Sequence, residues 1–274
     1  MSGGAEAHAA AADMKPAALH HRKPPPAAWS AEGFDYGGFR FVPCIGPEIG
    51  EIREDYPSFV LMKTAPLVAS YEQELPVSVG NLLELGIMKG GSCAFLEALL
   101  QPQNHLAIDI HGFAGDGLAE LTAHVAATGR RFRADYATSQ SDIPRILDLW
   151  QEVSGTRGEF DLVIDDASHD YELSLRSFDG LFPLIKPGGI YVLEDWGWAH
   201  WNGPWQDSRN RDFHRPALSN LLIHACLSVT GGSGFVESVK VTPNAAFIVR
   251  GPNPSTSFSV VDSYLNRNRP KTTL

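Results

Sequence analysis

From about residue 78 onward, short apolar runs that end in glycine or acidic residues alternate with segments long enough to form helices. This alternation is typical of parallel βαβ units, in which a crossover helix follows each strand. The apolar runs predict strands over 81–85, 105–110, 131–134, 160–165 and 189–193. The segments between them predict helices over 92–100, 117–127, 143–153 and 171–184.

The last part of the chain has a different pattern. An apolar segment over 217–229 predicts a helix, and two β-like runs follow it over 236–241 and 246–249. Thr242-Pro243-Asn244 joins these runs and predicts the turn of a hairpin. We therefore expect an α/β fold with a doubly wound, mostly parallel sheet, helices on both faces and an antiparallel terminal hairpin.

The first 77 residues lack this regular alternation. Residues 1–28 consist mainly of Ala, Gly, His and Pro, and contain too few large apolar groups to offset the entropy of ordering, so they predict a disordered tail. Residues 29–77 are aromatic and irregular, with a helical run over 59–75, and we interpret them as an N-terminal cap or lid. The main domain is expected over 78–252, with a C-terminal tail over 253–274.

Composition and charge exclude several classes of protein. The chain has 22 Lys and Arg against 32 Asp and Glu, a net charge of −10, and no basic cluster, which argues against nucleic-acid binding. No apolar run is long enough to span a membrane, and no export signal is apparent. Cys44, Cys93 and Cys226 are odd in number and form no CxxC pair, so we expect reduced thiols in a cytoplasmic protein.

A glycine-rich turn follows the first strand of the regular part. The strand carries Glu84, Gly86 and Gly90 follow it, and Ser92 is placed to cap the next helix. Glycines allow a ligand to approach the backbone closely. A pyrophosphate-binding turn has GxGxxG spacing and no carboxylate against the anion, so Glu84 favours a cationic, amine-bearing ligand such as S-adenosylmethionine.

Two further acids end the next two strands. Asp109 lies where a carboxylate accepts hydrogen bonds from both ribose hydroxyls of a nucleoside, and Asp135 is expected to line the adenine pocket. Many βα turns are rich in glycine for structural reasons alone, and the turn by itself leaves both interpretations open. Glu84 and Asp109 together favour a nucleotide site.

Two neighbouring strands end in pairs of acids. Asp165-Asp166 ends the run over 160–165, and Glu194-Asp195 follows the run over 189–193. Because ligands of open α/β sheets bind at the carboxyl ends of strands, we expect Asp166, Glu194 and Asp195 to converge. Three such carboxylates repel one another unless a cation neutralises them, and oxygen ligands suit magnesium. A single acid there more often caps a helix, but the convergent set favours a metal site.

His169 lies three positions after Asp166. A loop histidine is more often structural, but an unperturbed pKa near 6.5 suits a general base, and this position brings His169 within reach of a hydroxyl at the metal.

Trp196, Trp198, Trp201 and Trp205 follow the second acidic pair. Such a segment either folds inward as core or offers flat aromatic faces to a sugar or another ring-bearing substrate. The sequence leaves both alternatives open.

The motifs together resemble class I S-adenosylmethionine-dependent methyltransferases, and more narrowly the metal-dependent branch with macrolide-sugar and rhamnosyl O-methyltransferases and cephalosporin-hydroxylase-like proteins. The resemblance covers about residues 78–250 and depends on four runs: Glu84-Leu85-Gly86 with Gly90-Gly91-Ser92, Asp165-Asp166-Ala167-Ser168-His169, the segment 181–189, and Tyr191-Val192-Leu193-Glu194-Asp195. It implies a Rossmann-like fold, magnesium ligands at Asp166, Glu194 and Asp195, and a base at His169. Asp165 is counted with the cofactor-binding residues. The loop over 196–205 and the segment 135–138 depart from the family pattern.

We therefore expect magnesium-dependent transfer of a methyl group from S-adenosylmethionine to a hydroxyl of a sugar or a natural-product small molecule. A nicotinamide-dependent dehydrogenase is a second interpretation, disfavoured by Glu84 and by the missing GxGxxG spacing. A third is a non-catalytic cofactor-binding protein that acts through its tryptophan-rich loop. The expected partner is a small hydroxyl-bearing molecule, and homo-oligomerisation is left open.

Overall fold

The computed structural model describes residues 32–45, 52, 55–112 and 117–264. The predicted disordered tail over 1–28 lies outside the described residues, as does the end of the predicted C-terminal tail.

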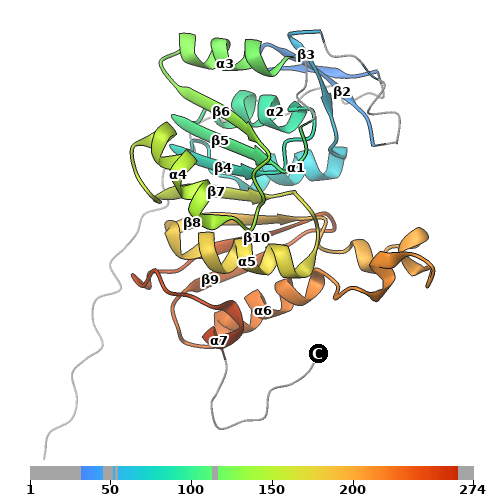
Figure 1. The fold of residues 1–274 in the computed structure, drawn as a ribbon, viewed down its shortest axis with the longest axis vertical. Coiled ribbons are helices and arrows are strands. Elements are labelled where there is room, and N and C mark those ends of the chain that lie inside the picture. Colours follow the sequence, from blue (N-terminus) through green and yellow to red (C-terminus); the bar gives the residue numbers. More distant parts are fainter. Residues whose placement is uncertain (1–31, 46–51, 53–54, 113–116, 265–274) are drawn as a thin grey trace, which may run out of the picture.

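A seven-stranded sheet forms the centre of the molecule, in the order β6-β5-β4-β7-β8-β10-β9 (Figure 1). Its first five strands run parallel, and β10 pairs antiparallel with both β8 and β9. The predicted fold class, including the terminal hairpin, is confirmed. The strands are β4 (Asn81–Leu85), β5 (Asn104–Asp109), β6 (Arg131–Tyr136), β7 (Phe160–Asp165), β8 (Ile185–Glu194), β9 (Val236–Val241) and β10 (Ala245–Arg250).

Helices cover both faces of this sheet. Successive side chains of a strand point to opposite faces, so the apolar strands build a core on each face. Leu82 and Ile164 belong to the core beneath α1, α2 and α3, whereas Leu83 and Val163 belong to the core beneath α4, α5 and α6. The helices are α1 (Ala65–Glu74), α2 (Gly91–Leu100), α3 (Leu118–Ala127), α4 (Ile143–Ser154), α5 (Tyr171–Leu181), α6 (Ser219–Thr230) and α7 (Val260–Ser263). Short 3-10 helices lie at Phe182–Leu184, Trp198–His200, Pro204–Gln206 and Arg211–His214.

The predicted helix over 59–75 is wrong in its first part. Ser58–Leu61 is strand β3, which pairs parallel with β2 (Phe39–Pro43), and β2 pairs antiparallel with β1 (Phe34–Tyr36). The helix begins only after Thr64, whose side chain accepts a hydrogen bond from the Leu67 amide as an N-cap. Pairing of β3 with β2, whose partner residues lie 18 positions earlier, overrides the local helical pattern.

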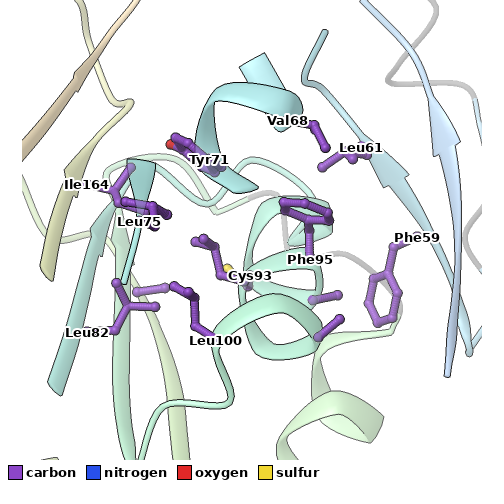
Figure 2. Close-up of a cluster of buried hydrophobic side chains, with 14 of the residues drawn as sticks. Phe59, Leu61, Val68, Tyr71, Leu75, Leu82, Cys93, Phe95, Leu100 and Ile164 are labelled. Atoms are coloured by element: carbon purple, nitrogen blue, oxygen red, sulfur yellow. The ribbon is translucent and has the colours of Figure 1, made fainter. Parts of the chain in front are cut away.

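The N-terminal elements share a hydrophobic core with α2 (Figure 2). A Cβ at Gly91 would lie 1.9 Å from the Val60 carbonyl oxygen, so glycine is required for β3 to approach α2 this closely. The division into a cap over 29–77 and a main domain stays a prediction. The side chains of this shared core include Phe59, Leu61, Val68, Tyr71, Leu75, Leu82, Cys93, Phe95, Leu100 and Ile164.

Among the described helices, none is both long enough and apolar enough to cross a membrane.

Candidate active site

A cavity of about 340 Å³ opens at the carboxyl ends of β4, β5 and β7. The turn after β4 forms one wall, and the segment that ends β3 closes another. Six predicted site residues line this cavity together: Gly86, Ser92, Asp109, Asp166, His169 and Asp195. Five predicted site residues lie outside its lining: Glu84, Gly90, Asp135, Asp165 and Glu194.

The glycine turn owes its shape to close backbone contacts. Gly86 has a φ of 102°, and a Cβ there would lie 2.1 Å from the carbonyl oxygen of Asp166. Gly90, with a φ of 93°, is itself the N-cap of α2, so Ser92 lies inside the first turn and does not cap the helix as predicted. Gly86 and Ser92 of this turn both line the cavity.

Asp109 holds the glycine turn in place. Its Oδ2 accepts hydrogen bonds from the amides of Ile87 and Met88, each at 2.9 Å, and its Oδ1 accepts one from the His111 amide at 2.8 Å. A carboxylate offers about four acceptor positions, so roughly one is left for a ligand. Asp109 both shapes the turn and lines the cavity, and its predicted contact with ribose hydroxyls stays a prediction.

Glu84 points away from the cavity, into the core. The side chain is fully buried, and its Oε2 lies 3.3 Å from Nε2 of His105, whose Nδ1 lies 3.0 Å from Oε1 of Glu97. Burial alone would lower the pKa of His105, but the carboxylates of Glu84 and Glu97 raise it to about 9. Glu84 thus compensates the positive charge of the buried His105 imidazolium. The predicted contact of Glu84 with the cofactor amine stays a prediction.

Asp135 lies near the end of β6 and accepts hydrogen bonds from Arg133 of the same strand and from Thr138 in the loop that follows. This places Asp135 in a structural role beside the cavity, where Thr138 and not Asp135 supplies the lining.

Asp165 acts on the cavity through Gln140. It accepts hydrogen bonds from the Tyr191 hydroxyl at 2.7 Å and from Gln140 Nε2 at 3.0 Å, and burial raises its pKa to about 6. Gln140 Oε1 in turn accepts from the Ser168 amide at 3.0 Å. Sequence reasoning missed Gln140, because no local motif marks it.

A lysine that sequence reasoning also missed neutralises part of the acidic cluster. Lys63 Nζ donates to Glu194 Oε1 at 2.7 Å, to Glu194 Oε2 at 2.8 Å and to Asp166 Oδ2 at 3.0 Å. The Tyr71 hydroxyl also donates to Glu194 Oε1. Burial would lower the pKa of Lys63, but the charges of Asp166 and Glu194 raise it above its usual value. In the sequence, the one sign of a special role for Lys63 is that this charged residue ends an apolar run.

His169 faces the other side of Asp166. Its Nε2 lies 3.7 Å from Asp166 Oδ1 and 3.9 Å from Asp195 Oδ2, distances that leave space between the three groups. His169 and Asp195 have positive φ values of 52° and 49°. Non-glycine residues in this region are strained by about 1 to 3 kcal/mol, and the surrounding structure must hold them there.

Asp166, His169 and Asp195 fit a divalent cation. One ligand atom from each lies within 4.8 Å of the others. Burial and the charge of Asp166 raise the pKa of Asp195, against the opposing effect of His169, so a cation at this point would relieve uncompensated charge. Glu194 is not part of this set, because its oxygens face Lys63 and Tyr71.

The sequence that forms this site also matches that of known proteins. Residues 83–196 match the family model of a methyltransferase domain. The predicted resemblance to methyltransferases is thereby confirmed, and the matched residues include the glycine turn, both acidic pairs and His169.

The curated relatives of the methyltransferase segment are named O-methyltransferases. The chain is 49% identical over 57 residues to demethylmacrocin O-methyltransferase of Streptomyces fradiae, over 21% of this chain and 14% of the relative. It is 40% identical over 124 residues to 8-demethyl-8-alpha-L-rhamnosyl tetracenomycin-C 2'-O-methyltransferase of Streptomyces olivaceus, over 42% of this chain and 32% of the relative. The matched segments span about a third or less of these relatives.

A solved structure shares the fold of the methyltransferase segment. The MycE methyltransferase of the mycinamycin biosynthetic pathway, in complex with Mg and SAH, superposes with a TM-score of 0.50 at 22% identity. The match covers 70% of this chain and 49% of that protein.

The tryptophan-rich loop after the methyltransferase segment is mainly structural. Trp196 Nε1 donates to the Thr242 carbonyl and Trp198 Nε1 to the His169 carbonyl, each at 3.0 Å. Trp205 packs against Trp198, with ring centroids 5.4 Å apart. Trp201 is 37% exposed and remains open to a ligand. The core alternative thus holds for three of the four tryptophans.

Proposed function

We propose that the chain is an S-adenosylmethionine-dependent O-methyltransferase that acts on a hydroxyl of a sugar carried by a natural product. The observation that carries this proposal is the position of His169, which faces Asp166 and Asp195 at the wall of the cavity that the glycine turn and Asp109 shape. The names of the relatives support a sugar hydroxyl as acceptor.

The cavity suits the cofactor in both shape and chemistry. Gly86 of the glycine turn lines the cavity, and the free acceptor position of Asp109 suits a ribose hydroxyl. Thr138 and Gln140 add polar groups on the side where the base is expected. About 340 Å³ lies within the usual range of small-molecule sites.

A divalent ion, for which we propose magnesium, would be held by Asp166 and Asp195. When bound, it would supply Lewis-acid polarisation that lowers the pKa of the acceptor hydroxyl. The third predicted ligand, Glu194, is engaged by Lys63 and Tyr71.

His169 would take the proton. Its Nε2 faces the space where the hydroxyl would lie, and its backbone is held by the hydrogen bond from Trp198. General-base catalysis requires hydrogen-bond reach and the neutral imidazole. The cavity walls would then orient the acceptor oxygen in line with the methyl group of the cofactor. This orientation reduces the entropic cost of reaching the transition state.

The proposal is tested by a methylation assay. The purified chain is incubated with methyl-labelled S-adenosylmethionine, magnesium and rhamnosylated or deoxysugar-bearing polyketides, and products are identified by mass spectrometry. We expect a methylated sugar, at least tenfold less product after metal removal with a chelator, and recovery when magnesium is returned. Cofactor binding by calorimetry without product on any acceptor would favour a non-catalytic module, and full activity in excess chelator would exclude the metal.

A further inference from the structure

Lys63 occupies a position that separates Glu194 from the other two acids. Its side chain is 1% exposed, and its ammonium has three donors, which match three acceptors: both oxygens of Glu194 and Oδ2 of Asp166. The Tyr71 hydroxyl adds a further donor to Glu194. Every hydrogen-bonding direction of the ammonium is thus taken by a carboxylate oxygen, and both oxygens of Glu194 accept hydrogen bonds from Lys63.

Lys63 neutralises only part of the negative charge of the acidic cluster. In their ionised forms Asp166, Glu194 and Asp195 bring three negative charges, and Lys63 returns one positive charge. Two negative charges remain, on the side where Asp166 Oδ1 and Asp195 Oδ2 face His169. A divalent ion balances that remainder on the His169 side, whereas an ion between Asp166 and Glu194 would meet the ammonium there.

We propose that Lys63 is the built-in cation of the acidic cluster, so that Glu194 is not a metal ligand in this chain and a divalent ion is held on the Asp166 and Asp195 side. Lys63 is a positioning residue, since it acts through the two acids. It precedes the matched methyltransferase segment 83–196 and comes from the N-terminal part of the chain. The N-terminal part of the chain therefore contributes to the proposed metal site through the ammonium group of Lys63.

The inference rests on the metal part of the proposed function and not on methyl transfer, so its test measures ion binding alone. Manganese is titrated into the full chain, and free Mn²⁺ is followed by electron paramagnetic resonance. Glu194→Gln keeps the shape of the side chain, and we expect it to change Mn²⁺ affinity by less than about fivefold, because only a neighbouring charge is lost. Asp195→Asn removes a ligand, and we expect at least about tenfold weaker binding.

Lys63→Met tests the same inference from the opposite direction. It frees Glu194 and Asp166 Oδ2, and we expect Mn²⁺ to bind at least about tenfold more tightly. Lys186→Met is the matched control, because Lys186 pairs with Asp161 at the surface with Nζ 2.7 Å from Oδ1 and its loss changes the net charge equally. We expect the control to bind Mn²⁺ like the wild type.

Two results would overturn the inference. One is a loss of Mn²⁺ affinity in Glu194→Gln as large as in Asp195→Asn, which would make Glu194 a ligand. The other is the absence of Mn²⁺ binding in the wild type and in every variant. Circular dichroism checks that each variant is folded. If Lys63→Met does not fold, the comparison of Glu194→Gln with Asp195→Asn decides the question, since neither removes the ammonium.

Discussion

His169 is the residue on which the proposed proton transfer depends. Replacing it with Ala should lower the single-turnover rate by about 10² to 10⁴, because general-base catalysis contributes that much, while the affinity for SAH stays within about threefold. His200→Ala is the control, since His200 is exposed and bonds to Ser219 outside the cavity. A loss of less than tenfold for His169→Ala would assign the proton to another group.

Asp109 shapes the glycine turn and lines the cavity, so its replacement should weaken cofactor binding in two ways. Asp109→Ala removes three backbone hydrogen bonds that shape the glycine turn as well as the proposed ribose contact, and hydrogen bonds to charged groups contribute about 1.5 to 3 kcal/mol each. We expect SAH affinity in calorimetry to fall at least about tenfold. Asp135→Ala, outside the cavity lining, should change it much less. Unchanged affinity of Asp109→Ala would exclude Asp109 from the site.

Among the elements, the contact between β3 and α2 carries the cavity wall that includes Lys63. A Cβ at Gly91 would lie 1.9 Å from the Val60 carbonyl oxygen, so Gly91→Ala must push β3 away from α2. We expect a loss of about 1 to 3 kcal/mol in the free energy of unfolding, measured with urea, together with weaker SAH binding. Gly112→Ala is the control, because among the described residues no heavy atom apart from its chain neighbours lies within 4 Å of its Cβ position. Equal stability of the two variants would contradict this account.

At the scale of the whole molecule, the buried imidazolium of His105 should make stability depend on pH. Its pKa in the folded state is about 9, above the 6.5 of an unfolded histidine, so its contribution is complete below pH 6.5 and is lost as the pH rises through 9. We expect the free energy of unfolding to fall on the order of 3 kcal/mol across this range. Urea titrations of His105→Gln should show a distinctly flatter profile, whereas the exposed His124→Gln should follow the wild type. Parallel profiles for wild type and His105→Gln would mean that His105 is neutral.

Local patterns in the sequence were sufficient for the parallel sheet and for half of the site. Strands and helices after residue 78 follow from the spacing of apolar residues, because burial on a sheet requires that spacing. Acids at strand ends, such as Asp166 and Asp195, were predictable as cavity residues, since ligands of α/β sheets bind at that edge.

Only the tertiary structure decided what depends on contacts between distant segments. Residues 58–61 became a strand because β2 pairs with them, and Glu84 turned into the core because His105 lies beside it. Lys63 lies 131 positions before Glu194, and no local period or motif links the two. The sequence alone predicted that a cation would balance three converging acids. Tertiary packing decided that an ammonium from the N-terminal segment supplies part of that charge, because only the folded chain brings the two segments within hydrogen-bond distance.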